Sequence, residues 1–226
     1  MRFSWKHALL AAPLAVFLFA VGVRAGDDHA GHGHAEHAKA SLLADAPENA
    51  EIGKLAPDFV LTDTEGNEHH LAHYVDQGYT VVLEWFNPDC PFVKKHHLHN
   101  KSMAGTYQTF ADEKVVWLAV NSAAPGLQGY GVDYNKKAMK EYSIEYPMLL
   151  DETGVVGKAY GAKTTPQIYV IHEGVLMFNG PLDEVAKPGK LGEKNYVKEV
   201  LEGCLAGKDV EPAQIKSYGC NVKYAS

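Results

Sequence analysis

Residues 79–96 read YTVVLEWFNPDCPFVKKH. The first eight positions form an almost continuous apolar run, rich in β-branched and aromatic residues, which is typical of a strand buried on both faces. Asn87, Pro88 and Asp89 are turn residues. They deliver Cys90 to the start of a helix, and the next residue, Pro91, suits the first helical position. The sequence therefore predicts a strand, a turn, a cysteine and a helix in direct succession.

The predicted position of Cys90 favours a reactive thiol. A helix N-terminus and nearby cations both stabilise the thiolate, which is the nucleophilic form of cysteine. Lys94, Lys95 and His96 follow closely, whereas the negative charge of Asp89 acts in the opposite sense. Because the preceding turn is polar, we expect the sulfur near the surface. We interpret Cys90 as a nucleophile, with an inert buried cysteine as the alternative.

Val93 occupies the position at which a Cys-x-x-Cys pair would carry its second sulfur. An oxidised Cys90 therefore needs another thiol to return to its reduced form. Cys220 could be this resolving thiol if a flexible C-terminal tail brings it to Cys90. The alternatives are a structural disulfide between Cys204 and Cys220, and an unpaired Cys220.

The first 25 residues have the features of a signal peptide. Arg2 and Lys6 precede an apolar stretch over residues 8–23, and a small-residue cleavage site ends at Ala25. About sixteen apolar residues are short for a transmembrane helix. We expect an exported, periplasmic or secreted protein that would touch a membrane only through an uncleaved segment. In such a compartment three cysteines suggest one disulfide and one free thiol.

Export changes the charge of the chain. It removes Arg2, Lys6 and Arg24 and no acidic residue, so the formal net charge goes from −7 to −10. This acidic balance argues against nucleic-acid binding. Residues 26–226 then contain no arginine at all.

Residues 26–50 form a tail rich in Gly, Ala and His, which we predict to be disordered because it offers little apolar surface to bury. His29, His32, His34 and His37 lie in this tail. Neutral imidazole binds zinc, copper and nickel, so the cluster could hold any of these ions loosely. The alternative is a solvated tail, and the predicted chemistry requires no cofactor.

Residues 51–207 are expected to form one domain, followed by a C-terminal tail over residues 208–226 with no clear period. Periodicity and turn residues predict an entry hairpin near residues 55–67, a short connecting or helical piece at 69–75, and a closing hairpin. The order of elements indicates an α/β fold with a central mixed sheet and helices on both faces. Expected strands are 80–86, 115–121, 146–151, 167–171 and 175–179, and expected helices are 91–110, 135–142, 153–160 and 195–205.

Four segments together resemble the thioredoxin-like superfamily, and more closely its redoxin branch, the alkyl hydroperoxide reductase and thiol-specific antioxidant (AhpC/TSA) proteins. These segments are residues 56–66, residues 84–91 and residues 160–166, with Gly174 and Gly180 in the closing hairpin. They span roughly residues 52–182. The resemblance implies a thioredoxin-like fold.

The resemblance also implies roles for three residues. Thr165-Pro166 matches the cis-proline segment, in which the proline lies against the active-site sulfur and the preceding backbone pairs with a bound chain. The alternative is an ordinary trans proline. Glu84 matches a buried acid that assists proton transfer. Otherwise Glu84 pairs with a lysine or faces solvent at the strand edge, because a buried carboxylate needs a task or a partner.

Two departures separate the chain from peroxiredoxins. The pattern typical of peroxiredoxins is Pro-x-x-x-Thr/Ser-x-x-Cys, whereas this chain has Leu83 at the proline position and Asn87 at the Thr/Ser position. Peroxiredoxins also use an arginine, whose fork geometry a lysine does not reproduce. Efficient peroxidase activity is therefore not expected.

Three functions follow from these patterns. The first is an exported thiol-dependent oxidoreductase or antioxidant that acts through Cys90 on disulfides or peroxides, with an external thiol reductant or a disulfide-bearing protein as partner. The second is a metal-handling protein that uses the histidine tail, with a copper or zinc site at Cys90, His96 and His99 as a variant. The third is a redoxin fold used only for protein interaction.

Overall fold

The computed structural model describes residues 41–226. The predicted signal peptide and the four tail histidines therefore lie outside the described residues. Within residues 41–226, every helix is too short or too polar to cross a membrane.

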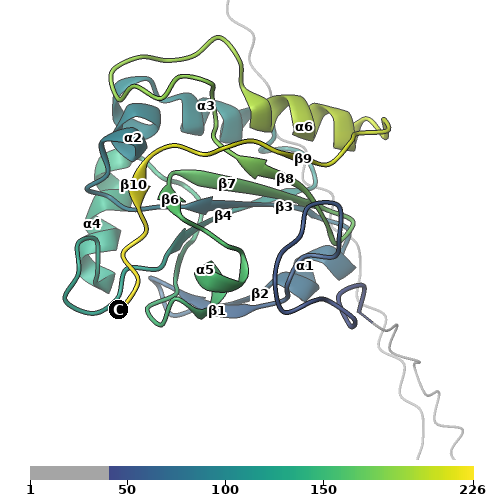
Figure 1. Cartoon of the computed structure of the whole chain (residues 1–226), viewed down its shortest axis with the longest axis horizontal. Helices are drawn as coiled ribbons and strands as arrows, with labels where there is room; N and C mark the ends of the chain where they lie inside the picture. The colour runs from purple at the N-terminus through teal and green to yellow at the C-terminus, as the bar shows by residue number, and fades with distance from the viewer. Residues whose placement is uncertain (1–40) are drawn as a thin grey trace, which may run out of the picture. The chain divides into compact units, whose positions relative to one another are not determined.

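A mixed sheet of eight strands forms the centre of the fold (Figure 1). Its central strand β3 pairs in parallel with β4 on one side and antiparallel with β7 on the other. The order across the sheet is β2-β1-β5-β4-β3-β7-β8-β9. The strands are β1 (Val60–Asp63), β2 (Glu68–His70), β3 (Thr80–Trp85), β4 (Val115–Asn121), β5 (Met148–Leu150), β7 (Gln167–His172), β8 (Val175–Gly180) and β9 (Ala213–Gln214).

Helices cover both faces of this sheet, and a separate hydrophobic core lies under each set. The first face carries α1 (Leu71–Asp76) and α5 (Val155–Ala159). The opposite face carries α2 (Pro91–Lys94), the π-helical turn η1 (Lys95–His99), α3 (Ser102–Thr109), α4 (Val132–Tyr142) and α6 (Tyr196–Leu205). The α/β, thioredoxin-like arrangement expected from the sequence is thereby confirmed.

Strand β3 connects the two cores because its side chains alternate between the faces. Leu83 and Trp85 enter the core under α1 and α5, whereas Val82 enters the opposite core. All six residues of the strand are buried. Burying each aliphatic side chain contributes roughly 1.5–3 kcal/mol, which explains why this strand has such a strong sequence signal.

The helix expected over residues 91–110 is divided into three parts. After α2 the chain widens into η1, where the Asn100 amide donates to the Lys95 carbonyl five residues earlier at 3.0 Å. Lys101 then adopts a left-handed conformation (φ 50°) before α3 begins. Such π-helical turns are frequent at functional sites. Here the turn leaves Lys95, His96 and His97 all buried.

The N-terminal boundary of the folded part lies earlier than the sequence predicts. Residues 41–50, expected to belong to the disordered tail, pack against the domain. Leu43 is in the core under α1, and the Ala50 amide donates to the Ala159 carbonyl at 2.9 Å. Leu43 supplies the apolar contact that a disordered segment lacks.

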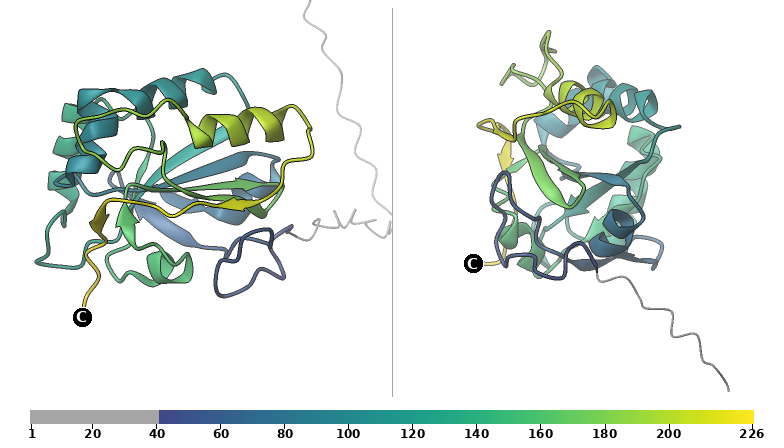
Figure 2. Two further views of the ribbon diagram at one scale, coloured as in Figure 1. Left: turned by 45° about the horizontal axis from the view of Figure 1, so that its top comes forward. Right: turned by 90° about the vertical axis from the view of Figure 1, so that its right-hand side faces the viewer.

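The C-terminal segment is also more regular than expected. Strand β9 extends the main sheet by pairing in parallel with β8. Strand β10 (Cys220–Asn221) pairs antiparallel with β6 (Thr164–Thr165) in a second, two-stranded sheet. Figure 2 shows this last part of the chain running alongside β8, passing β6 and continuing to the C-terminus. The tail is therefore part of the fold.

Candidate active site

Cys90 lies at the N-cap of α2, at the end of the turn that follows β3. Its amide donates to the Asn87 carbonyl at 3.1 Å, and its thiol donates to the Thr165 carbonyl at 2.9 Å. Only 2% of the residue is exposed. The expectation of a sulfur near the surface is therefore wrong, because Thr165 and the C-terminal strand enclose it.

Side-chain contacts fix the turn before Cys90. The Asn87 side chain donates to the Gln128 carbonyl at 2.9 Å and accepts from the Asp89 amide at 3.0 Å. Gly129 lies so close that a Cβ there would be 2.6 Å from Asn87 Nδ2. The Asp89 carboxylate accepts a hydrogen bond from the Tyr134 hydroxyl at 2.6 Å. These contacts engage both Asn87 and Asp89 in holding the turn.

The peptide bond between Thr165 and Pro166 is cis, as the resemblance implies. Thr165 belongs to β6, and its register partner across the two-stranded sheet is Cys220. The Val222 amide extends this pairing by donating to the Lys163 carbonyl at 3.1 Å. The backbone before the cis-proline is thus paired with the chain's own C-terminus.

Cys220 is the strand partner of Thr165, whose carbonyl oxygen accepts the hydrogen bond of the Cys90 thiol, and this pairing brings Cys220 next to Cys90. Burial, together with the adjoining Cys90 thiol, raises the pKa of Cys220 to about 11. Cys220 is therefore a neutral thiol at physiological pH in this arrangement. Strand pairing holds it in place, so the approach to Cys90 does not depend on a flexible tail.

Cys204 occupies a different environment. It is buried in α6, where burial raises the pKa of its thiol and the charge of Glu173 adds to the effect. All three cysteines are free in this structure. The structure thus contains neither the Cys204–Cys220 disulfide considered from the sequence nor a Cys90–Cys220 disulfide, and the thiol that adjoins Cys220 is that of Cys90.

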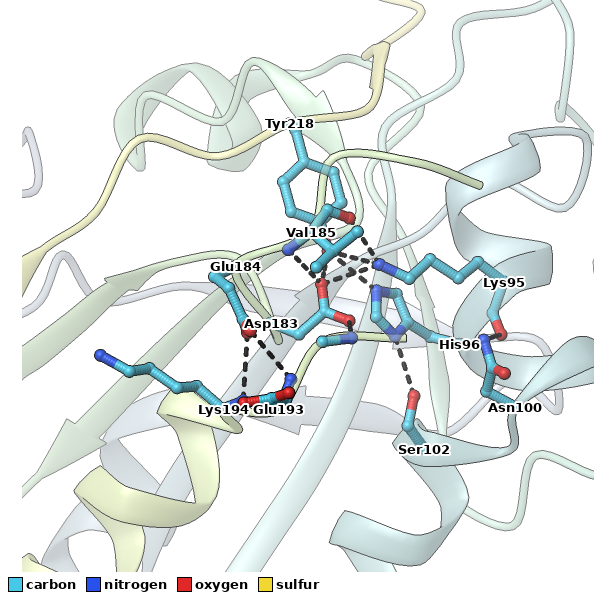
Figure 3. Close-up of polar contacts among 11 residues, drawn as sticks. Lys95, His96, Asn100, Ser102, Asp183, Glu184, Val185, Glu193, Lys194 and Tyr218 are labelled. Carbon is cyan, nitrogen blue, oxygen red and sulfur yellow. Dashed lines mark hydrogen bonds and ion pairs between the residues drawn. The ribbon is translucent and has the colours of Figure 1, made fainter. Parts of the chain in front are cut away.

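A buried polar cluster contacts Tyr218, which lies in the tail two residues before Cys220 (Figure 3). Lys95 Nζ lies 2.7 Å from Asp183 Oδ1, and both side chains are almost completely buried. The Tyr218 hydroxyl donates to the Asp183 carboxylate and accepts from Lys95 Nζ at 3.1 Å. The same hydroxyl lies 3.2 Å from His96 Nε2, whose ring also contacts the Ser102 hydroxyl.

The charges of this cluster are well defined at neutral pH. Burial, followed by the positive charge of Lys95, lowers the pKa of His96 to about 3. Burial alone would raise the pKa of the Asp183 carboxyl, but hydrogen bonds from Lys95 and Tyr218 outweigh it and lower that pKa. The Tyr218 hydroxyl therefore meets an ammonium, a carboxylate and a neutral imidazole.

Two further contacts fix the tail around Cys220. Gly219 lies against β6, where a Cβ would be 2.0 Å from the Thr165 carbonyl oxygen. Beyond Cys220, the Tyr224 ring lies over Gly154 and Gly157, and its hydroxyl donates to the Ala162 carbonyl at 2.8 Å. The tail is thus anchored by a tyrosine on each side of the cysteine.

Glu84 is completely buried, and each of its carboxylate oxygens has a partner. His97 Nε2 lies 2.7 Å from Oε1, and the Tyr146 hydroxyl donates to Oε2 at 2.7 Å. Burial, followed by the charge of Glu84, raises the pKa of Tyr146 well above its ordinary value. Neither of the partners considered from the sequence, a lysine or solvent, is observed. A role for Glu84 in proton transfer stays a prediction.

The described residues offer no metal centre. Between residues 41 and 226, no group of three or more His, Cys, Asp or Glu side chains could hold an ion. His96 and His97 instead make the hydrogen bonds described above. The metal site considered at Cys90, His96 and His99 is thus not assembled.

The sequence contained one overlooked signal for the tail. Tyr218, Cys220, Val222 and Tyr224 alternate with other residues at period two, which is the pattern of a strand. No comparable signal marks the Lys95–Asp183 pair, because its members are 88 positions apart in the chain.

Similarity to known proteins agrees with this geometry. A sequence model of the AhpC/TSA family matches residues 52–178, which is more than half of the chain. The chain belongs to the AhpC/TSA family. This redoxin is therefore an oxidoreductase, and its resemblance to the thioredoxin-like superfamily is confirmed.

Curated relatives of this redoxin include proteins named thiol-disulfide oxidoreductase ResA. The protein from Geobacillus thermodenitrificans is 27% identical over 160 residues, which cover 71% of this chain and 74% of the relative. The protein from Bacillus subtilis is 29% identical over 125 residues, covering 55% of this chain and 64% of the relative.

Two solved structures resemble this redoxin over most of its length. A hypothetical protein from Sinorhizobium meliloti has 28% identity and a TM-score of 0.69, covering 79% of this chain and 97% of that one. An uncharacterized conserved protein from Geobacillus kaustophilus has 28% identity and a TM-score of 0.65, covering 77% and 93%. The match to both structures therefore extends over most of the described residues and is not limited to the sheet.

Proposed function

We propose that this redoxin is a thiol-disulfide oxidoreductase in which Cys90 is the nucleophile and Cys220 the resolving thiol. The observation that supports it most is the pairing of β10 with β6, which holds Cys220 beside Cys90. Val93, at the usual position of a second sulfur, cannot fulfil that role. The names of the ResA relatives agree with exchange between thiols and disulfides.

The proposed reaction has two exchange steps. The Cys90 thiolate attacks one sulfur of a substrate disulfide, forms a mixed disulfide and releases the other substrate sulfur as a thiolate. Cys220, after losing its proton, then attacks the Cys90 sulfur and releases the second substrate thiolate. The substrate disulfide gains two electrons, and the two cysteines become a disulfide. An external dithiol reverses both steps and restores the enzyme.

Disulfides are more suitable substrates than peroxides for this site. Residues 26–226 contain no arginine to stabilise a peroxide beside the thiolate. At the position of the peroxiredoxin Thr or Ser, the Asn87 side chain is bound to the Gln128 carbonyl and the Asp89 amide. A disulfide of an exported protein is the proposed substrate, and an external thiol reductant is the proposed electron donor.

The proposed chemistry needs only the two sulfurs. We therefore expect no cofactor, and a metal chelator should leave the activity unchanged. Deletion of residues 26–40 should also leave it unchanged, whereas the metal-handling alternative predicts a loss.

Export belongs to the same proposal and rests on residues 1–25 alone. Expression of the full precursor in a bacterial host, followed by fractionation and N-terminal sequencing, tests it. We expect a periplasmic protein beginning at Gly26. A cytoplasmic protein that retains Met1 would overturn export without affecting the redox proposal.

Cys220→Ser is the most informative variant for the redox proposal. With a model disulfide, the variant should accumulate a mixed disulfide on Cys90 in stoichiometric amount, because no second thiol can release it. The wild-type chain and the Cys204→Ser control should release both substrate thiols. Turnover of the Cys220→Ser variant at the wild-type rate would contradict the assignment of Cys220.

A further inference from the structure

We infer that the groove filled by the C-terminal tail is a recognition site for an extended polypeptide that carries a Tyr-Gly-Cys sequence. The tail of this chain is then the resident occupant, which a protein substrate of the same pattern displaces. The inference adds to the proposed function the class of polypeptide segment that reaches Cys90. It rests on the proposed function only for the thiol-disulfide exchange at Cys90.

The first argument comes from the backbone. Strand β6 pairs with β10 and with no other strand of residues 41–226. If the tail left, the backbone groups of Thr164 and Thr165 would face outward beside Cys90. An exposed edge of this kind binds an extended chain by adding a strand, and side-chain pockets along it then give selectivity.

The second argument comes from the socket that holds Tyr218. Its polar wall is the buried Lys95–Asp183 pair, which meets the hydroxyl, and Phe92 forms an aromatic wall 5.4 Å from the Tyr218 ring centroid. Lys95 Nζ also lies 5.0 Å from that centroid. A site built to hydrogen-bond a hydroxyl rejects an analogue that lacks it, because its buried polar groups are then left unpaired. The socket should therefore prefer tyrosine over phenylalanine two residues before the cysteine.

The third argument concerns the residue immediately before the cysteine. Gly219 has a φ of +145°, and a Cβ there would collide with the Thr165 backbone at 2.0 Å from its carbonyl oxygen. The collision involves main-chain atoms, so a side-chain rotation cannot relieve it. Only glycine fits between the socket and the cysteine.

The path of the tail before β10 permits displacement. Between β9 and β10 the chain borders a cavity of about 490 Å³, which is also lined by Lys163 and Thr164. The hydroxyls of Thr164 and Ser217, both on its lining, have no hydrogen-bond partner. A segment whose polar groups lack hydrogen-bond partners opens locally at a lower free-energy cost than the packed core.

The test uses the full chain and a fluorescent peptide with the sequence of residues 215–226, in which serine replaces the cysteine. In the wild-type chain the covalently attached tail competes at a high effective concentration, so the peptide should bind weakly. In the Gly219→Ala chain the attached tail no longer fits, and the peptide should bind at least ten-fold more tightly. Gly105→Ala, at a glycine with open space around it, is the matched control and should behave as wild type.

Peptide variants then test the selectivity of the groove. Relative to the parent peptide on the Gly219→Ala chain, a peptide with phenylalanine for tyrosine should bind about ten-fold more weakly. A peptide with alanine for glycine should show no binding. Equal binding of all three peptides, or equal binding of the parent peptide to wild-type and Gly219→Ala chains, would overturn the inference. If Gly219→Ala fails to fold, Tyr218→Ala takes its place with the same expectations.

The two proposals fail separately, because the probe peptide carries no thiol. Selective peptide binding without a Cys90–Cys220 disulfide in the wild-type chain would support the groove and refute the resolving role. A Cys90–Cys220 disulfide without peptide selectivity would do the reverse.

Discussion

Lys95 and His97 lie two residues apart in the same π-helical turn, yet they support different parts of the molecule. Each makes a fully buried contact of 2.7 Å with a carboxylate, Lys95 with Asp183 and His97 with Glu84. In both cases a tyrosine hydroxyl completes the group. Tyr146 comes from within the domain, whereas Tyr218 comes from the C-terminal tail.

This difference separates a stabilising cluster from a positioning one. Burying charged groups costs free energy, which is recovered only when every charge is paired and hydrogen-bonded. At Glu84 all partners fold together, so the cluster should contribute to the stability of the core. At Asp183 one partner is carried by the segment that delivers Cys220. The second cluster should therefore also affect the position of the thiol.

Lys95→Met should produce the largest effect because it disturbs both the stability of the fold and the position of the Cys220 thiol. It leaves the Asp183 carboxylate buried without its cation, which costs about 3–5 kcal/mol in the free energy of unfolding. It also removes a partner of the Tyr218 hydroxyl, so alkylation of Cys220 should become faster in the folded chain. Denaturant unfolding and iodoacetamide labelling measure the two effects. Unchanged labelling would show that the pair does not hold the tail. Lys94→Met, at the neighbouring lysine, is the control.

His97→Ala should lower the free energy of unfolding by a similar or slightly smaller amount, about 3 kcal/mol, because Glu84 loses its partner. Under native conditions, however, Cys220 should stay as protected as in the wild-type chain. His99→Ala, at an exposed position of the same turn, should change neither quantity. Rapid labelling of Cys220 in the His97→Ala chain would remove the distinction between the clusters.

Tyr218→Phe should affect the tail with little effect on the core. The lost hydrogen bonds to charged groups are worth about 1.5–3 kcal/mol. This free energy corresponds to roughly 10- to 150-fold faster alkylation of Cys220 if the tail opens alone. Tyr196→Phe, on α6 outside the cluster, is the control. A change in global unfolding with no change in alkylation would place Tyr218 among the core residues instead.

Mild acid, down to pH 5.5, should give the smallest effect, and it should act on the tail cluster. The pKa of His96 is about 3 in the folded chain, against an ordinary value of 6.5, so the unfolded chain binds more protons between these values. Stability is therefore full above pH 6.5 and falls as the pH decreases toward 3. At pH 5.5 the loss is about 1.4 kcal/mol. His96→Gln should remove this part of the pH dependence in unfolding titrations. The same slope in both proteins would contradict the assignment.

Local patterns predict much of this fold. Strand β3 and the hairpin of β7 and β8 have strong periodic signals because their side chains are buried along contiguous stretches. Cys90 and the cis-proline segment could also be located from the sequence, because turn residues and family motifs mark them. The roles proposed for Cys90 and Pro166 stay predictions.

The remaining features depend on contacts between distant segments. The π-helical turn has the composition of an ordinary helix, so periodicity predicts one continuous helix over residues 91–110. Glu84 is hydrogen-bonded to His97, which is 13 positions away, and to Tyr146, which is 62 positions away. Strand β10 contains only two residues, and its pairing with β6 bridges 55 positions, which local sequence does not encode.

Peptide mapping of the oxidised protein tests the central claim most directly. The reduced full chain is treated with one equivalent of a small disulfide, its free thiols are alkylated at acidic pH, and non-reduced peptides are identified by mass spectrometry. We predict a disulfide between Cys90 and Cys220, with Cys204 alkylated. A Cys204–Cys220 disulfide, or a stable mixed disulfide on Cys90 beside an alkylated Cys220, would contradict the account.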